Sequence, residues 1–227
     1  MGCVLWVFLL LLCVPSDCGL YHVCLLTSER PLSYVKHSIR SLHKEGFRAI
    51  TVIDADGASG FGVNVSAFRK LADCVDDGKD VVEGVSCKVE QSNYDVAMAL
   101  WVCDSRARKA KWILFVEDDM EACAGSLKEV KAALKSSALS AVQFSKFSRA
   151  FAVRRGVSVL DLVSNIRCQA HSAPYDIVLW NTFPARTVTR NLFHHMGTVS
   201  TIQYRNKDDY LAAYSHMRGD VCGQALD

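Results

Sequence analysis

Three consecutive carboxylates, Glu117, Asp118 and Asp119, follow an apolar run that begins at Trp112. Acids placed this close together repel one another and lose solvation, which costs stability unless a cation compensates their charge. A hard divalent ion such as Mn²⁺ or Mg²⁺, itself bound to a diphosphate, would provide that compensation. The alternative interpretation is a solvated turn whose acids cap the helix that follows.

A further acid, Asp176, stands between Pro174 and the apolar run from Ile177 to Trp180. Loss of solvation at this place would raise the pKa of the carboxyl group, which suits a general base. The alternative is an aspartate that caps the helix beginning at Ile177.

Two adjacent histidines, His194 and His195, form another candidate. Neighbouring side chains point in different directions, so at most one of the two is expected to serve a metal ion. A single histidine is more often structural than a ligand, and the residues alone leave both interpretations open.

The segments that must position these residues alternate between strand and helix patterns. The run from Trp112 is apolar, β-branched and aromatic, which predicts a strand buried on both faces that ends at the acids. The alternation predicts an α/β fold with a mostly parallel central sheet flanked by helices. In such a sheet ligands bind outside the carboxyl ends of the strands, where the three acids are placed. Further strands are predicted at Tyr21–Thr27, Ala49–Ile53, Val81–Val85 and Leu139–Ser145, and helices at Pro31–Lys44, Val65–Cys74, Gln91–Arg108, Gly125–Ser136 and Val157–Ile166.

Composition limits the class of protein. Of 227 residues, 50% are hydrophobic and 22% are charged, which is typical of one globular domain with a sizeable core. The formal net charge is only +2, and the basic residues are scattered along the chain. This pattern argues against nucleic acid as a partner.

The N-terminus differs from the rest of the chain. Cys3 to Val14 is an unbroken apolar run that ends at Pro15, shorter than the roughly 20 residues that span a bilayer. We predict a signal peptide or short signal anchor over residues 1–18, followed by one catalytic domain over residues 19–227. This places the protein in the secretory pathway (Golgi or ER lumen) or outside the cell, with weak membrane association if the segment is retained. The alternatives are a buried N-terminal segment and an incorrect start site.

Ten cysteines agree with that compartment. Cys3 and Cys13 belong to the leader, and the even number that remains is expected to include disulfides in an oxidising environment. The chain has no Cys-x-x-Cys pair, which argues against a zinc site. Asn64-Val65-Ser66 is an N-glycosylation sequon, which also agrees with secretion.

Several of these motifs occur together, in the same order, in one enzyme family. The chain resembles the N-acetylglucosaminyltransferase IV family, inverting GT-A enzymes that branch N-glycans, and more distantly the related GPI-anchor N-acetylgalactosamine transferase. The resemblance extends from about Tyr21 to Tyr210. It rests on Gln91-x-Asn93-x-Asp95, Glu117-Asp118-Asp119, Gln143-Phe144-Ser145, Pro174-x-Asp176 with Leu179-Trp180, and Leu192-Phe193-x-His195-x-Gly197-x-x-Ser200.

The resemblance implies a role for each matched residue. Asp119 would be the direct ligand of Mn²⁺ or Mg²⁺, which holds a UDP-sugar, and His195 would be a further ligand that closes over the diphosphate. Glu117 would lie nearer the ribose, and Asp176 would act as the catalytic base. The nucleotide-sugar would be bound by Glu117, Asp118, Gln91, Asn93 and Asp95.

Together these features predict a metal-dependent inverting glycosyltransferase, a hexosyltransferase that uses a UDP-sugar donor, with N-acetylglucosamine as the expected sugar. The acceptor would be a glycan on a glycoprotein or glycolipid. The alternatives are a GPI-glycan N-acetylgalactosamine transferase, an inactive carbohydrate-binding relative, and a phosphohydrolase or nucleotidyltransferase that uses the same metal site.

Overall fold

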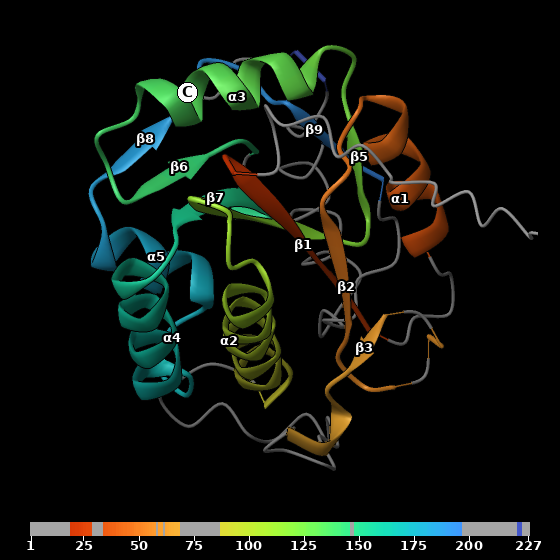
Figure 1. Ribbon diagram of the computed structural model, residues 1–227. Coiled ribbons are helices and arrows are strands. Elements are labelled where there is room, and N and C mark those ends of the chain that lie inside the picture. Colours follow the sequence, from red (N-terminus) through yellow and green to blue (C-terminus); the bar gives the residue numbers. More distant parts are fainter. Residues whose placement is uncertain are drawn as a thin grey trace, which may run out of the picture.

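A central β-sheet with helices on both faces organises the molecule (Figure 1). The structure, a computed structural model, describes residues 19–28, 34–57, 59–60, 62–68, 87–145, 148–196 and 222–223. The predicted leader at residues 1–18 and the strand predicted at Val81–Val85 lie outside these residues. Within them, no helix combines the length and the apolar character that crossing a bilayer requires.

Within the part of the chain that the structure describes, the central sheet has seven strands in the order β3-β2-β1-β4-β7-β6-β8. β7 runs antiparallel to both β4 and β6, and every other pairing in this sheet is parallel. The predicted α/β class with a mostly parallel central sheet is therefore confirmed. The strands are β1 (Tyr21–Thr27), β2 (Ile50–Asp54), β3 (Val63–Asn64), β4 (Trp112–Glu117), β6 (Ala141–Gln143), β7 (Ala150–Arg154) and β8 (Ala185–Thr187).

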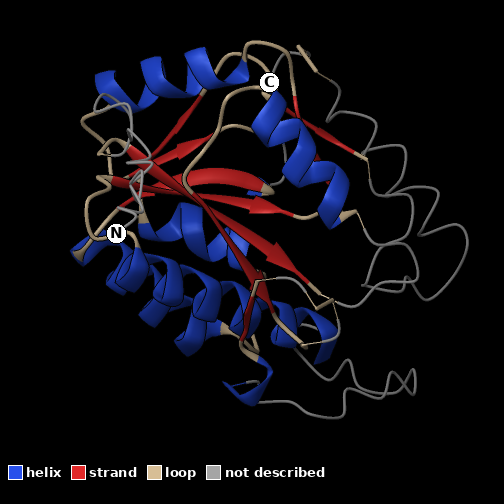
Figure 2. Ribbon diagram, turned by 45° about the vertical axis from the view of Figure 1, so that its right-hand side comes forward, coloured by secondary structure: helices blue, strands red, loops and turns tan. Residues whose placement is uncertain are grey.

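Helices cover the two faces of this sheet, as the turned view in Figure 2 shows. One face packs against α1 (Val35–Lys44) and α3 (Ser126–Ser136). The other packs against α2 (Cys87–Arg106), α4 (Val157–Gln169) and α5 (Tyr175–Thr182). The flanking helices expected from the sequence are thus present on both sides.

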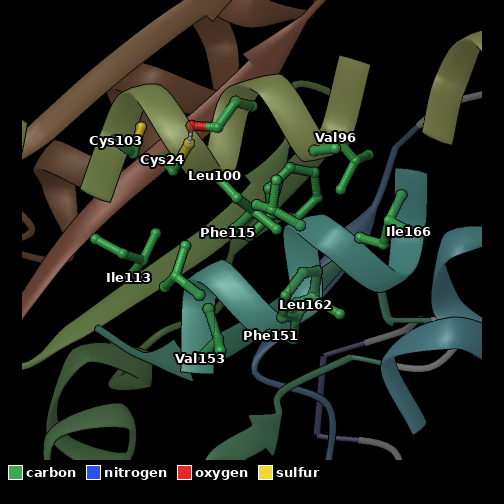
Figure 3. Packing of buried hydrophobic residues seen from close by; sticks show 14 of the residues in the cluster. Cys24, Val96, Leu100, Cys103, Ile113, Phe115, Phe151, Val153, Leu162 and Ile166 are labelled. Carbon is green, nitrogen blue, oxygen red and sulfur yellow. Dashed lines mark hydrogen bonds between the residues drawn. The ribbon is translucent and has the colours of Figure 1, made fainter. Parts of the chain in front are cut away.

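β4 contributes side chains to the cores on both sides of the sheet. This arrangement arises because successive side chains of a strand point to opposite faces. Ile113 and Phe115 belong to the core beneath α2, α4 and α5, whereas Leu114 and Val116 belong to the core beneath α1 and α3. All four are fully buried. Phe115 stacks on Phe151 of β7 with ring centroids 5.0 Å apart (Figure 3). This packing confirms the predicted two-sided burial and fixes where the strand delivers its acids.

Several element boundaries differ from the sequence-based expectations. α2 begins at Cys87, earlier than the predicted Gln91, and ends at Arg106. The predicted strand Leu139–Ser145 is shortened to β6. Of the helix predicted over Val65–Cys74, the described residues contain a 3-10 turn at Ser66–Phe68. β7 and β8 were not predicted; both are short, and their formation depends on pairing with distant strands.

A second, two-stranded sheet lies near α1 and α3 in Figure 1. It joins β5 (Met120–Ala122) to β9 (Phe193–His195) in antiparallel register. β5 follows the three acids directly, so this small sheet determines what lies opposite them.

A disulfide anchors the same region. Cys123, the residue after β5, is bonded to Cys222 across a sequence separation of 99 residues. The neighbouring backbone is also tied together, because the Cys123 N–H donates to the Leu192 carbonyl at 3.0 Å. The expectation of at least one disulfide is confirmed. Among the described residues, Cys87 is also disulfide-bonded, whereas Cys24, Cys103 and Cys168 are free thiols.

Candidate functional site

The three acids lie at the carboxyl edge of the parallel strands. Glu117 is the last residue of β4, and Asp118 and Asp119 form the turn into β5. In the register of the sheet, Glu117 stands opposite Leu26 of β1, and Thr27 stands opposite Asp54 of β2. Three parallel strands therefore end together at the edge where α/β proteins bind ligands.

The solvated-turn alternative is wrong for the second and third acids. The exposed fraction of Asp118 is 0% and that of Asp119 is 4%. Neither caps the following helix, because α3 begins at Ser126 and its N-cap residue is Gly125. The buried charge of these two side chains calls for specific partners.

Asp118 is held by the core of the fold. Its Oδ2 atom accepts a hydrogen bond of 2.6 Å from the Thr27 hydroxyl, and its carbonyl oxygen accepts one from the Ser38 hydroxyl of α1. These bonds join β1, α1 and the acidic turn, so Asp118 fixes the backbone from which its two neighbours project. A direct role in binding the nucleotide-sugar stays a prediction for this residue.

Asp119 and His195 meet side by side. The His195 Nε2 atom lies 3.0 Å from the Asp119 Oδ2 atom, and the two side chains are 7% and 5% exposed. The small sheet brings them together, because Met120 pairs with His195 and the Met196 N–H donates to the Asp119 carbonyl at 2.8 Å. The family resemblance implies that both residues are metal ligands, and the fold places them in contact.

The chemistry of this pair fits a divalent ion. The two side chains are within hydrogen-bond distance of each other at 3.0 Å. Two ligands at neighbouring corners of an octahedron with bonds of about 2.1 Å also lie about 3 Å apart, so the pair could bind one ion without a large rearrangement. Mg²⁺ and Mn²⁺ commonly take few protein ligands and complete their shells with phosphate oxygens and water. No group of three or more His, Cys, Asp and Glu side chains able to hold a metal occurs among the described residues. Asp119 and His195 thus fit an ion whose remaining ligands come from a diphosphate.

Glu117 belongs to a different cluster, one that sequence reasoning missed. The Tyr175 hydroxyl donates a hydrogen bond of 2.9 Å to the Glu117 Oε1 atom. The Arg149 Nε atom lies 3.8 Å from the Glu117 Oε2 atom, and the Glu117 N–H donates to the Arg149 carbonyl at 3.0 Å. Arg149 directly precedes β7, whose antiparallel direction brings its first residues to the last residues of β4. Adjacency to the candidate base was the only sequence signal for Tyr175, and Arg149 had none.

Asp176 lies on the first turn of α5, beside Tyr175, and is partly buried. Burial raises the pKa of its carboxyl group; backbone hydrogen bonds from the first turn and the charge of Arg149 oppose this effect. Burial, followed by the negative charges of Glu117 and Asp176, raises the pKa of Tyr175 well above its ordinary value. Asp176 follows directly after Tyr175, the residue whose hydroxyl is bonded to Glu117.

The helix-cap alternative for Asp176 is wrong in position. Pro174, not Asp176, is the N-cap residue of α5, and the helix begins at Tyr175. The carboxylate still accepts backbone hydrogen bonds from its own residue and from Ile177. The raised pKa therefore persists despite local hydrogen bonding, because burial outweighs it.

The three polar residues predicted at the start of the long helix are buried in α2. Gln91 donates from Nε2 to the Asp95 Oδ1 atom at 2.8 Å. Asn93 donates from Nδ2 to the Ala170 and Ala173 carbonyls, each at 2.8 Å, and so ties α2 to the segment that follows α4. Asn93 has a structural task in this arrangement. Nucleotide contacts of all three residues stay predictions.

Comparisons with known proteins add little. No family model matches the chain. No curated protein matches it either. Among solved structures, it is similar to TarS of S. aureus in complex with UDP-GlcNAc, with a TM-score of 0.49, 11% identity, and coverage of 92% of this chain and 68% of TarS. It is also similar to Drosophila β-1,4-galactosyltransferase 7 in complex with manganese, UDP-Gal and xylobiose, with a TM-score of 0.35, 11% identity, and coverage of 84% and 78%. At these identities and TM-scores, neither likeness assigns an activity to this chain.

Proposed function

We propose that the protein is a metal-dependent inverting glycosyltransferase of the GT-A type, which transfers a sugar from a UDP-sugar to a glycan acceptor. The observation that carries the proposal is the contact between Asp119 and His195 at the carboxyl edge of the sheet. Two residues before Asp119, Glu117 accepts a hydrogen bond from Tyr175, the residue that precedes the partly buried Asp176. A pair of side chains that fits a metal ion and a carboxylate of raised pKa are the two components that such a transfer needs.

Each protein group then has a defined task. Asp119 and His195 would hold a divalent ion, which would neutralise charge on the leaving diphosphate as a Lewis acid. Glu117 faces the ribose of the donor. Asp176 accepts the proton of the acceptor hydroxyl as that oxygen bonds to the anomeric carbon.

The bond changes balance without a covalent enzyme intermediate. The acceptor oxygen attacks from the face opposite the diphosphate, the bond from the anomeric carbon to the diphosphate oxygen breaks, and UDP leaves. The configuration of the anomeric carbon is inverted. Asp176 ends the step protonated and returns its proton to solvent.

We further propose that the donor sugar is N-acetylglucosamine, that the acceptor belongs to a glycoprotein or glycolipid, and that the enzyme works in the Golgi or ER lumen or is secreted. Motif order supports the sugar, and the Cys123–Cys222 disulfide supports an oxidising compartment. A GPI-glycan N-acetylgalactosamine transferase is the alternative for the same site. A second alternative is a carbohydrate-binding relative of these enzymes that has no transferase activity.

A panel of UDP-sugars tests the proposal. The full chain is heated with Mn²⁺ and each UDP-sugar, and the donor is expected to raise the unfolding temperature only when the metal is present. A ligand at a hundredfold excess over its Kd stabilises by about 2.7 kcal/mol. Release of UDP in the presence of glycan acceptors then separates an enzyme from an inactive relative. Absence of stabilisation by every UDP-sugar with Mn²⁺ contradicts the proposed function.

A further inference from the structure

Both oxygens of the Glu117 carboxylate are oriented by side chains from other elements. Oε1 accepts the hydrogen bond from the Tyr175 hydroxyl at 2.9 Å, and Oε2 lies 3.8 Å from Arg149 Nε. Glu117 remains partly exposed, with 21% of its side chain accessible, whereas 15% of the Arg149 side chain is accessible. The carboxylate is thus held by interior side chains, while part of the Glu117 side chain is accessible to solvent at the edge where α/β proteins bind ligands.

Tyr175 is itself held firmly. Its exposed fraction is 8%. Its ring lies edge-on to Phe115, with centroids 6.1 Å apart, and tilted against Phe151, with centroids 6.4 Å apart. These two rings stack on each other in the core beneath α2 and α4. A hydroxyl mounted on a packed ring makes a hydrogen bond of fixed direction, because the side chain has few torsions left to vary.

We infer that Tyr175, assisted by Arg149, is a positioning residue that aims the Glu117 carboxylate at the ribose hydroxyls of the donor. The inference rests on the proposed function and adds a residue to it. Because Tyr175 and Asp176 are consecutive on the first turn of α5, the same turn that orients the nucleotide ligand also carries the base. Donor binding and proton acceptance are thereby built on one rigid element.

The readout that distinguishes positioning from general stability is discrimination between nucleotides. UDP offers two ribose hydroxyls to Glu117, whereas 2′,3′-dideoxy-UDP offers none and keeps the same diphosphate. The Tyr175→Phe variant keeps the packed ring and loses only the hydroxyl. It is expected to bind UDP more weakly by about tenfold, the usual effect of losing a hydrogen bond to a charged group. Its affinity for the dideoxy nucleotide should change by less than about twofold.

The experiment measures the Kd of both nucleotides, with Mn²⁺ present, by titration calorimetry. The matched control is Tyr21→Phe, which removes the hydroxyl of another buried tyrosine. Tyr21 is the first residue of β1 and lies at the end of that strand far from the acids. This variant should leave the ratio of UDP affinity to dideoxy-UDP affinity unchanged. Arg149→Lys keeps the charge and loses the guanidinium geometry. Like Tyr175→Phe, it should lower the ratio of UDP affinity to dideoxy-UDP affinity. If Tyr175→Phe does not fold, the Arg149→Lys result alone decides the inference.

The outcomes separate the inference from the function that it rests on. A wild-type protein that fails to bind UDP with Mn²⁺ overturns both. A wild-type protein that binds UDP and the dideoxy nucleotide equally leaves donor binding intact and overturns the ribose role of Glu117, and with it the inference. Equal weakening of both nucleotides by Tyr175→Phe, or no change in either, overturns the inference alone.

Discussion

His195 Nε2 and Asp119 Oδ2 are 3.0 Å apart although the two residues are separated by 76 positions in the chain. The pairing of β5 with β9 sets this distance, because the strands place His195 opposite Met120, the residue after Asp119. A contact made by strand register is reproducible from molecule to molecule.

Replacement of Asp119 by Asn is expected to abolish Mn²⁺-dependent binding of UDP while leaving the fold intact. Asn keeps the shape of the side chain but lacks the negative charge that holds a divalent ion. Calorimetric titration with UDP, with and without Mn²⁺, measures the effect. Glu121→Gln is the matched control, since Glu121 lies two residues away and faces His37 at 3.3 Å instead. Equal UDP affinity in Asp119→Asn and wild type would exclude the metal site.

Asp176→Asn should bind UDP-sugar and Mn²⁺ normally and turn over about 10² to 10⁴ times more slowly, the usual cost of removing a general base. Steady-state UDP release and donor titration provide the two measurements. Asp161→Asn is a suitable control, because Asp161 is an exposed acid on α4. Loss of donor binding in Asp176→Asn would make the residue a ligand. Wild-type turnover would show that the base is a residue other than Asp176.

The pH dependence of the rate should report the same residue. Burial raises the pKa of Asp176, so its carboxylate is protonated, and kcat/KM falls, at a higher pH than for an ordinary aspartate. Stability changes with pH in the opposite direction to the rate. Because the pKa of Asp176 is raised in the folded state, the free energy of unfolding decreases as the pH rises through that pKa. Asp176→Asn is therefore expected to unfold near pH 7 at no lower temperature than wild type. If the folded but slow Asp176→Asn variant still shows the fall of kcat/KM at low pH, another group causes that fall.

Removal of the disulfide by Cys222→Ala should lower the free energy of unfolding by about 2–5 kcal/mol, because the bond closes a long loop in the unfolded chain. Urea unfolding measures the loss. Cys168→Ala serves as control: Cys168 is an exposed free thiol, and its replacement should change stability by less than about 0.5 kcal/mol. Thiol counting in non-reduced protein from the secretory pathway should find fewer free thiols than cysteines, and a full count of free thiols contradicts the structure.

Glycosylation of Asn64 is expected when the chain is made in a secretory host. Asn64 is exposed on the short edge strand β3, and its Oδ1 atom accepts the Ser66 N–H at 2.8 Å. Glycosidase treatment should reduce the mass of wild type and of Ser66→Thr, which keeps the sequon, but not of Ser66→Ala. Secreted protein that contains the Cys123–Cys222 disulfide and carries no glycan would contradict this prediction.

Sequence reasoning succeeded where the pattern is local and the burial is two-sided. Tyr21–Thr27 is a strand with the predicted bounds, and the strand from Trp112 ends at the predicted acid. Both are apolar runs that have no stable alternative to burial between two layers. The α/β class and the placement of the acids at the carboxyl edge followed from these runs.

The missed parts are those that depend on distant partners. β5 and β9 are three residues each, too short for a periodic pattern, and exist because they pair with each other. Arg149 meets Glu117 only because β7 runs against β4, and no local feature of its surroundings signals that direction. The hydroxyl of Tyr175 contacts Glu117 directly, but the two residues are far apart in the sequence, and only the neighbouring Asp176 is predicted to be functional.

The Cys123–Cys222 bond also divides the site in a topological sense. Glu117 and Asp119 precede the covalent ring that this bond closes, whereas Arg149, Asp176 and His195 all lie inside it. One backbone cut anywhere within the ring leaves both fragments joined through sulfur. A protein nicked by a protease between α4 and α5 would therefore keep Asp119 covalently tethered to His195 and Asp176 until a reductant cleaved the disulfide.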